Sequence, residues 1–483
     1  MAAFETVIGL EVHLQLNTRT KMFCRCRNHF GDAPNTNVCP VCLGMPGSLP
    51  VINETAVRYA RQAGLMLNCA VAQFSKFDRK NYFYPDLPKA YQISQYDLPL
   101  CGKGHIDVEM DGGTRRFGIT RVHLEEDAGK LVHDGHGGGS LVDLNRSGTP
   151  LLEIVSEPDM RSPDEAHAYL VTLKQLMSYL DISDCNMEEG SLRCDANVSV
   201  RPAGQAAFGT KVEIKNMNSF KAVQKALAYE VRRQIAAIEA GQTIVQETRL
   251  FDANSEKTVS MRTKEQAHDY RYFPDPDLVP MTFTAAEIET LKAQLPERPA
   301  VRRERFAAQY GISAYDAGVL TAEKPLADYF EAAISAGMSG KAAANWIINN
   351  LMAELNAAHR SITDCPITPA HLAELGALIE GNVISGNIGK QIFPEMFNTG
   401  KAPEEIVNEK GLVQITDSAE IDAWVNEAIA RNPDVIESLK AGKGKAAGKL
   451  VGAVMQMSKG KANPALVNER IRHILIETHG LDA

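Results

Sequence analysis

The sequence lacks several features that would place the protein in a class at once. No apolar run approaches the roughly 20 residues needed to cross a bilayer. The first residues, MAAFETVIGLEV, lack the basic start and small-residue cleavage site of a signal peptide. We therefore expect a cytosolic protein with no membrane partner. A Gly-x-Ser-x-Gly turn is also missing, so the HGGGS stretch at His136 has no esterase nucleophile to serve, and nucleophilic hydrolysis is not indicated.

Excess basic charge and paired cysteines are missing as well. The formal net charge of −9 disfavours non-specific binding of nucleic acid, so an RNA partner would have to meet a local basic patch. Nine cysteines in 483 residues are few and odd in number, which argues against a disulfide scaffold. A thiolate metal site is the better interpretation.

The chain is long enough for about two to four domains. Up to about residue 280, short alternating runs such as LRCDANVSVR and KTVSMRT predict strands, with helices between them. Farther along, Ala343, Ile347, Leu351 and Leu355 recur every four residues, and helices dominate. These patterns predict an α+β fold with an antiparallel or mixed sheet. The predicted domains are residues 1–290, 291–404 and 405–483.

Capping residues predict where several helices begin. Ser162 followed by Pro163 opens one helix, and TAAE at Thr284 is a capping box that opens another. In the last domain, one amphipathic helix stops at Gly460, and a second begins with Asn463 as its cap.

The stretch TVIGLEVHLQLNT alternates apolar and polar residues, which predicts a strand with Glu11 and His13 on one face. Further carboxylates occur in RVHLEEDAGK and in NMEEGSLRCDANVSVR. Carboxylates with an occasional imidazole suit Mg²⁺, whereas the simpler interpretation is a solvated acidic surface. The candidate magnesium ligands are Glu11, His13, Glu125, Glu126, Glu189 and Asp195.

Cysteine spacing gives a more specific signal. The segment CRCRNHFGDAPNTNVCPVC contains one Cys-x-Cys pair and one Cys-x-x-Cys pair, formed by Cys24, Cys26, Cys39 and Cys42. Two such knuckles suit a tetrahedral zinc ion with a structural role. The alternative is four reduced thiols.

The segment KFDRKNYFYPDLPKAYQISQYDLPL interleaves basic and aromatic residues. Such a segment could hold phosphates by charge and stack a base on an aromatic ring, or it could pack its rings into the core. The candidate catalytic residues here are Lys80, Tyr82, Lys89 and Tyr91.

Near the end of the chain, residues 440–461 carry six lysines and no Asp or Glu. GKGKAAGKL is not a phosphate-binding loop, because its spacing is wrong and Leu450 stands where Ser or Thr should hold magnesium. The segment is a candidate contact with a phosphate backbone, or alternatively a solubilising turn. Its lysines are Lys440, Lys443, Lys445, Lys449, Lys459 and Lys461.

Long stretches of this sequence, including IGLEVHLQL, RKNYFYPDLPKAYQISQYDLPL, HLEEDAGK and EGSLRCDANVSVR, appear in one order along the chain. Together they resemble the B subunits of the tRNA-dependent amidotransferase. The resemblance covers essentially the whole chain. It implies a cradle-shaped catalytic domain, a helical domain and a small helical tail that approaches the tRNA.

The resemblance also implies a reaction. In this family, ATP and Mg²⁺ serve to phosphorylate the side-chain carboxylate of glutamate or aspartate attached to tRNA(Gln) or tRNA(Asn), and ammonia then displaces phosphate. A glutaminase A subunit supplies the ammonia through a channel, and a small C subunit completes the heterotrimer. Glu11, His13, Glu125 and Glu126 match the metal-binding positions, with Glu189 and Asp195 as neighbours. Lys80 and Lys89 would contact phosphate or line the ammonia route.

Two other functions fit parts of the pattern. A non-catalytic tRNA-binding scaffold would keep the acidic clusters for structure and would cleave no ATP. A free-standing amine ligase would act on a small acid without tRNA and would not need residues 405–483.

Overall fold

The computed structural model describes residues 4–133, 139–263, 270–413, 417–440, 446–458 and 460–480. Residues 136–138 of the HGGGS stretch lie outside the described residues. The chain divides into two compact units, residues 1–298 and 299–483. The first unit combines sheet and helix, whereas the described residues of the second unit form helices, which confirms the predicted α+β class.

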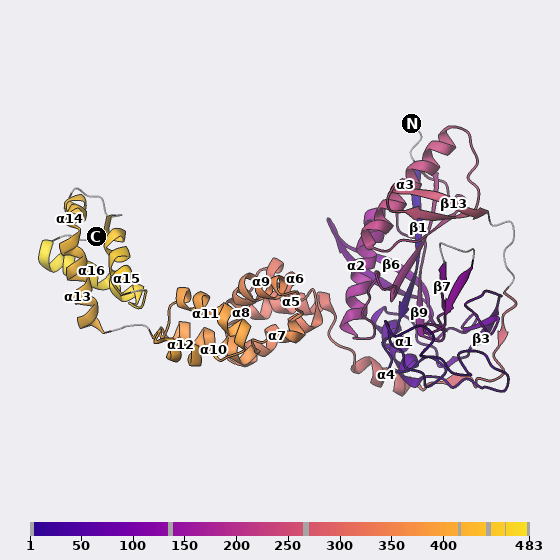
Figure 1. Cartoon of the computed structure of the whole chain (residues 1–483). Coiled ribbons are helices and arrows are strands. Elements are labelled where there is room, and N and C mark those ends of the chain that lie inside the picture. Colours follow the sequence, from indigo (N-terminus) through magenta and orange to yellow (C-terminus); the bar gives the residue numbers. More distant parts are fainter. Residues whose placement is uncertain are drawn as a thin grey trace. The chain divides into compact units, whose positions relative to one another are not determined.

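A mixed sheet forms the centre of the first unit (Figure 1). Strands β11 and β12 are parallel, and the other neighbouring pairs are antiparallel. Within the described residues it has eight strands. In order across the sheet these are β13 (Lys257–Thr263), β12 (Glu247–Asp252), β11 (Val212–Lys215), β10 (Leu192–Pro202), β1 (Phe4–Gln15), β9 (Pro150–Ser156), β6 (Gly113–Glu126) and β5 (Gly104–Met110).

From Ile8 to Leu14, one face of strand β1 is apolar. Ile8, Leu10, Val12 and Leu14 are at most 2% exposed and lie in the core of the first unit. Each such side chain contributes about 1.5–3 kcal/mol on burial. A slip of one residue would turn this whole set toward solvent, so the register of β1 is strongly fixed. Glu11 and His13 are therefore held on the opposite face.

Helices α1 (Glu54–Met66), α2 (Pro163–Tyr179) and α3 (Phe220–Glu239) cover the apolar face of the sheet. Figure 1 shows α2 and α3 side by side along it. The predicted cap at Ser162 is confirmed, since its side chain accepts a hydrogen bond from the Glu165 amide. The apolar face is thus closed, and chemistry is left to the other face.

A small sheet of β14 (Phe273–Pro274), β3 (Asp78–Asn81) and β4 (Tyr91–Ser94) contacts β6 through β4. The predicted basic and aromatic segment supplies β3 and β4. The remaining elements of the first unit are β2 (Phe74–Ser75), β7 (Lys130–His133), β8 (Ser140–Asp143), β15 (Met281–Thr282) and α4 (Ala285–Ala293). The capping box predicted at Thr284 opens α4.

The second unit contains two separate hydrophobic cores, the first built by residues 306–407. The predicted boundary at residue 404 falls within α12, whose Ile406 and Val407 belong to this first core. Its helices are α5 (Pro299–Tyr310), α6 (Ala314–Leu320), α7 (Lys324–Ser335), α8 (Gly340–Trp346), a π-helix (Ile347–Leu351), α9 (Met352–Ala357), α10 (Pro369–Glu380), α11 (Gly386–Thr399) and α12 (Pro403–Lys410), with a 3₁₀ turn at Ile362–Asp364.

The π-helix explains the spacing of four in the predicted apolar stripe. Ala343, Ile347, Leu351 and Leu355 are all buried, although a period of four drifts around a regular α-helix of 3.6 residues per turn. The extra residue of a π-turn offsets that drift and keeps the stripe on one side.

Residues 421–475 build the second core of this unit. The predicted helix starting after Asn463 is confirmed, with the Asn463 side chain accepting hydrogen bonds from two amides of the first turn. The helices are α13 (Ser418–Arg431), α14 (Pro433–Lys440), α15 (Ala447–Met457) and α16 (Pro464–His479). Among the described residues, none of the helices combines the length and apolar character that crossing a membrane requires.

Candidate active site

Four side chains form a row across the centre of the main sheet. His13 on β1 pairs with Arg193 on β10 and with Glu153 on β9, and Glu153 pairs in turn with His123 on β6. Directly paired residues share a face, so all four side chains lie on the face opposite the apolar core. Glu11 and Glu125 flank the row, each two residues from one of its histidines.

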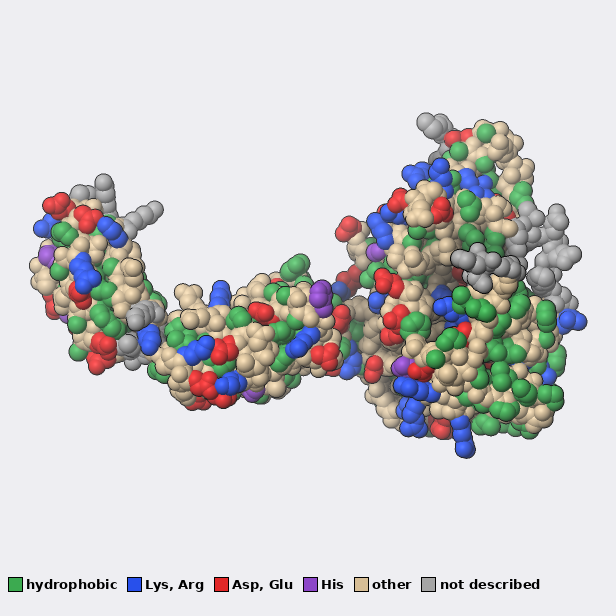
Figure 2. All heavy atoms as spheres, in the orientation of Figure 1, with side chains coloured by type: hydrophobic (Ala, Val, Ile, Leu, Met, Phe, Trp, Pro, Cys, Tyr) green, Lys and Arg blue, Asp and Glu red, His purple; other side chains and the backbone are tan. Residues whose placement is uncertain are grey.

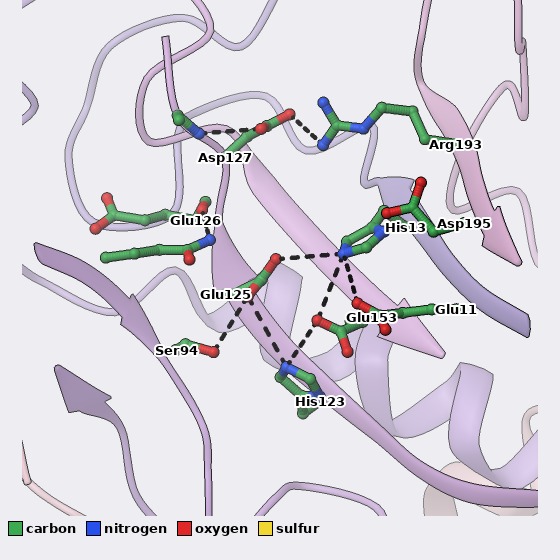
Figure 3. A network of polar contacts seen from close by, with 12 residues as sticks. Glu11, His13, Ser94, His123, Glu125, Glu126, Asp127, Glu153, Arg193 and Asp195 are labelled. Carbon is green, nitrogen blue, oxygen red and sulfur yellow. Dashed lines mark hydrogen bonds and ion pairs between the residues drawn. The ribbon is translucent and has the colours of Figure 1, made fainter. Parts of the chain in front are cut away.

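His13 is the centre of a cluster of carboxylates (Figure 3). Its Nε2 atom lies 3.4 Å from a carboxylate oxygen of Glu153, 3.8 Å from Glu11 and 3.9 Å from Glu125. The Nε2 atom of His123 also lies 3.9 Å from a carboxylate oxygen of Glu125 and 3.4 Å from one of Glu153. The expected convergence of Glu11, His13 and Glu125 is therefore present in the structure.

The pKa values reflect this crowding of charge in a buried place. Burial and the charge of Glu153 raise the pKa of Glu11. Burial lowers the pKa of His13, but the carboxylates of Glu153, Glu125 and Glu11 together outweigh burial and raise that pKa to about 9. Burial likewise opposes ionisation of Glu153, yet the charges of His123 and His13 hold its pKa well below the usual range. Positive charge is thus needed to hold these carboxylates ionised together.

A divalent cation would meet that need. Ligand atoms of Glu11, His13 and Glu153 all lie within 4.8 Å of one another, as do those of His123, Glu125 and Glu153. Oxygen ligands in this number, with room left for water or phosphate, fit Mg²⁺. The polar face can therefore hold a cation through Glu11, His13 and Glu153 or through His123, Glu125 and Glu153, and Glu125 also lies 3.9 Å from His13.

Three predicted ligands take other positions. Glu126 points away from the cluster, because alternation along β6 turns it to the other face, where it contacts Lys89 and accepts a hydrogen bond of 2.9 Å from the Ile93 amide. Asp195 pairs with Glu11 across the strands but forms an ion pair with Lys215. Glu189 lies exposed in a turn before β10.

Sequence reasoning missed Glu153 and His123. Glu153 interrupts the apolar run PLLEIVS, and a lone carboxylate in a strand buried on both faces is a signal of its own. His123 stands two residues before Glu125 in a strand, so the two share a face.

The basic and aromatic segment brings Lys80 to the cluster. Burial opposes the charge on Lys80, but the Glu125 carboxylate raises the pKa of the amine, which stays protonated. Its Nζ lies 4.8 Å from the ring centre of Tyr270 and 5.8 Å from that of Tyr82. Lys89 forms a buried ion pair with Glu126, and its Nζ is 5.3 Å from the Tyr91 ring. Only Lys80 of this pair faces the cluster.

A pocket of ≈ 280 Å³ opens beside Glu11. Its floor is the polar face of β1, β9 and β10, and the loop before β11 forms another wall with Phe208, Gly209 and Lys211. Phe208 is 59% exposed although it lines a pocket. A Cβ at Gly209 would lie 2.2 Å from the carbonyl oxygen of Val200, so this close approach requires glycine. The pocket thus places Phe208, Gly209 and Lys211 beside Glu11 of the cluster.

The four predicted zinc cysteines also converge. Their sulfur atoms lie within 4.8 Å of one another, and those of Cys39 and Cys42 are 3.9 Å apart. A tetrahedral site with Zn–S bonds near 2.3 Å places sulfurs about 3.8 Å apart. A hydrogen bond from Cys24 lowers the pKa of Cys42 to about 5, whereas burial raises that of Cys26 to about 11. The set fits a structural zinc ion.

The predicted tail lysines are only partly described. Lys440 is exposed at the end of α14, and Lys461 lies just before α16. Lys449 forms an exposed ion pair of 2.7 Å with Asp434, so its charge is partly neutralised. Lys443, Lys445 and Lys459 lie outside the described residues.

Comparison with known proteins identifies the family. The model of the GatB/GatE catalytic domain matches residues 6–289, which is more than half of the chain. This protein belongs to the GatB/GatE family. A second model, described as the GatB domain, matches residues 328–475.

Curated relatives in the family are named as the B subunit of aspartyl/glutamyl-tRNA(Asn/Gln) amidotransferase. The relative from Carboxydothermus hydrogenoformans is 58% identical over 475 residues, which cover 98% of this chain and 99% of the relative. That of Caldanaerobacter subterraneus is 57% identical over 472 residues, covering 98% and 99%. That of Geotalea uraniireducens is 58% identical over 469 residues, covering 96% and 98%. The resemblance stated from the sequence is confirmed.

Proposed function

We propose that this chain is the transamidating component of a tRNA-dependent amidotransferase and acts on Glu-tRNA(Gln), Asp-tRNA(Asn) or both. The single observation that carries the proposal is the convergence of Glu11, His13, Glu125 and Glu153 on one sheet face beside a pocket. The family relationship supplies the reaction class. The polar face and the pocket beside it support the proposal.

The reaction needs an activated carboxylate, because a free carboxylate is a poor acyl donor to ammonia. A carboxylate oxygen of the tRNA-linked side chain forms a bond to the γ-phosphorus of ATP, and the bond from that phosphorus to the ADP oxygen breaks. Ammonia then forms a bond to the acyl carbon, phosphate leaves with the bonding electrons, and the nitrogen gives up a proton. Both steps depend on positioning and on neutralising phosphate charge.

The nucleotide would occupy the pocket beside Glu11. Phe208 offers an exposed ring for stacking and Lys211 a positive charge. Mg²⁺ held by residues of this cluster would neutralise phosphate charge. Lys80 would add a second positive charge at the far side of Glu125.

The ammonia would come from a partner protein. Hydrophobic side chains gather on the surface of the first unit around β3 (Figure 2). A large exposed apolar surface of this kind marks an interaction site. We propose this surface as the docking site of the glutaminase A subunit, with Lys89, Tyr82 and Tyr91 near its ammonia outlet, and a small C subunit would complete the complex. The exposed residues are Phe74, Phe83, Tyr84, Tyr96, Leu98 and Phe273.

The helical unit would bind the tRNA body, with the lysines of residues 440–461 contacting its phosphates. The cysteine knuckles would hold a structural zinc ion near β1 rather than take part in the reaction.

The experiment uses the assembled complex with wild-type chain or with Glu11→Gln. We expect Glu11→Gln to abolish tRNA-dependent ATP hydrolysis while the partner's glutaminase activity persists. Unchanged ATP hydrolysis would overturn the metal assignment. A wild-type complex that never cleaves ATP would instead identify a tRNA-binding scaffold, and activity without tRNA would identify a free-standing ligase.

A further inference from the structure

The groups on the polar face follow one another in a fixed order along strands β1 and β10. The nucleotide pocket is lined by Gly9 and, across from it, Asn197. Two residues along β1 comes Glu11, and then His13 paired with Arg193. Arg193 therefore lies on the opposite side of the carboxylate cluster from the pocket.

Arg193 is held in place by a buried carboxylate. Its NH2 atom donates a hydrogen bond of 2.9 Å to Oδ2 of Asp127, which is 5% exposed. Gln15 donates to the same oxygen at 2.8 Å, and the backbone amide of Ala128 donates to the other oxygen at 3.0 Å. Arg146 approaches to 3.7 Å. Asp127 is thus fixed by several contacts and fixes Arg193 in turn.

Most of the guanidinium remains available to a ligand. An arginine side chain has five N–H donors in a planar fork. Among the described residues, the Arg193 side chain donates a hydrogen bond only to Asp127. The Arg193 side chain is 33% exposed. Figure 3 shows the guanidinium beside Asp127, on the His13 side of the cluster. The fork fits a carboxylate through two parallel hydrogen bonds.

In phosphoryl transfer, the attacking and leaving oxygens lie roughly in line on opposite sides of the phosphorus. With the nucleotide in the pocket and its γ-phosphate at the Glu11–His13 cluster, the attacking oxygen has to arrive from the side of Arg193. The carboxylate of the acceptor is an anion that must enter a face rich in negative charge. A fixed arginine on that side is the group that can receive it.

We propose that Arg193 binds the side-chain carboxylate of the tRNA-linked amino acid, and that Asp127 is its positioning residue. This rests on the proposed function. Arg193 holds the carboxylate while one of its oxygens forms the bond to the γ-phosphorus and ADP leaves with the electrons of the broken bond. It then stays on the carbonyl oxygen, where negative charge develops as ammonia forms its bond to the acyl carbon.

The test compares Arg193→Ala with Arg116→Ala in the assembled complex. Arg116 is a matched control, because it also pairs with an aspartate, Asp107 at 2.7 Å, but on an exposed part of β5 and β6. We expect Arg193→Ala to slow single-turnover ATP cleavage dependent on mischarged tRNA by about 100-fold or more, as loss of a transition-state donor does. Affinity for a non-hydrolysable ATP analogue should stay within about twofold, and Arg116→Ala should match wild type.

Two further variants separate binding of the carboxylate from a structural role. Added guanidinium ion should restore part of the rate to Arg193→Ala, whereas Arg193→Lys should remain slow because an ammonium lacks the planar fork. Asp127→Asn should slow the same step by about 10-fold without changing affinity for the ATP analogue, and Asp127→Glu should recover part of the loss.

The outcomes distinguish this inference from the function on which it rests. Wild-type rates in Arg193→Ala, with Glu11→Gln inactive, would overturn the role of Arg193 alone. A loss of ATP-analogue affinity as large as the loss of rate would place Arg193 on the nucleotide and also overturn the inference. Absence of tRNA-dependent ATP cleavage in the wild-type complex would overturn the proposed function itself.

Discussion

Neutralising Glu153 tests the cluster through a residue that contacts both of its histidines. Its carboxylate lies 3.4 Å from His13, 3.4 Å from His123 and 3.7 Å from Arg121. At an effective dielectric constant of about 20, each contact to a unit charge corresponds to a gross attraction of about 4–5 kcal/mol. Glu153→Gln retains the shape of the side chain and removes this charge.

The effect on metal binding should be large. Loss of a group that merely orients a metal ligand costs about 10–100-fold in affinity. Loss of a ligand charge should therefore exceed about 100-fold, or about 2.7 kcal/mol. The assay is titration of the assembled complex with Mn²⁺, followed by electron paramagnetic resonance of the free ion.

Glu126→Gln is the matched control. Glu126 is as buried as Glu125, at 3% exposed, but its carboxylate contacts Lys89 and the Ile93 amide on the other face. We expect Mn²⁺ affinity within about twofold of wild type in this variant. Equal losses in Glu153→Gln and Glu126→Gln, or no loss in Glu153→Gln, would refute the assignment of ligands.

Three other predictions concern separate parts of the chain. Metal-replete protein should contain one zinc per chain, and Cys39→Ser should lose it, as elemental analysis would show; zinc-free wild type would contradict the site. Replacing Lys443, Lys445 and Lys449 by Ala should reduce the slope of log affinity for tRNA against log salt by up to about three, whereas an unchanged slope would show that these lysines only solubilise. Glu331→Gln should lower the free energy of unfolding at pH 7 by about 2 kcal/mol in urea, because it breaks hydrogen bonds with Arg302 and Arg305. These arginines hold the pKa of Glu331 below its usual value against the effect of burial, so the difference in stability from wild type should shrink as pH falls through that lowered pKa. A difference that does not depend on pH would contradict the reasoning.

Local patterns were sufficient for several elements. The alternation in β1 and the run KTVSMRT predicted their strands, and the caps at Ser162, Thr284 and Asn463 predicted where helices begin. These signals act within a few residues, so the sequence displays them directly. The apolar stripe from Ala343 to Leu355 was also visible, but the π-helix that keeps it on one side was not, since it follows from packing.

The candidate site was predictable only where one strand carried the information. Glu11 and His13 belong to one alternating run, which places them together. Glu153 joins them through the pairing of β9 with β1, and that pairing links residues some 140 positions apart. Glu126 was grouped with Glu125 because the two are adjacent in sequence, whereas β6 continues through both and turns them to opposite faces.

The most direct test locates the cation itself. Anomalous diffraction from crystals of the assembled complex grown with Mn²⁺ and a non-hydrolysable ATP analogue would show where the ion lies. We expect one peak about 2.0–2.3 Å from Nε2 of His13 and from oxygens of Glu11, Glu125 or Glu153, with the analogue's phosphates against it. A peak away from these side chains, or an analogue bound with no ion at His13, would contradict the account.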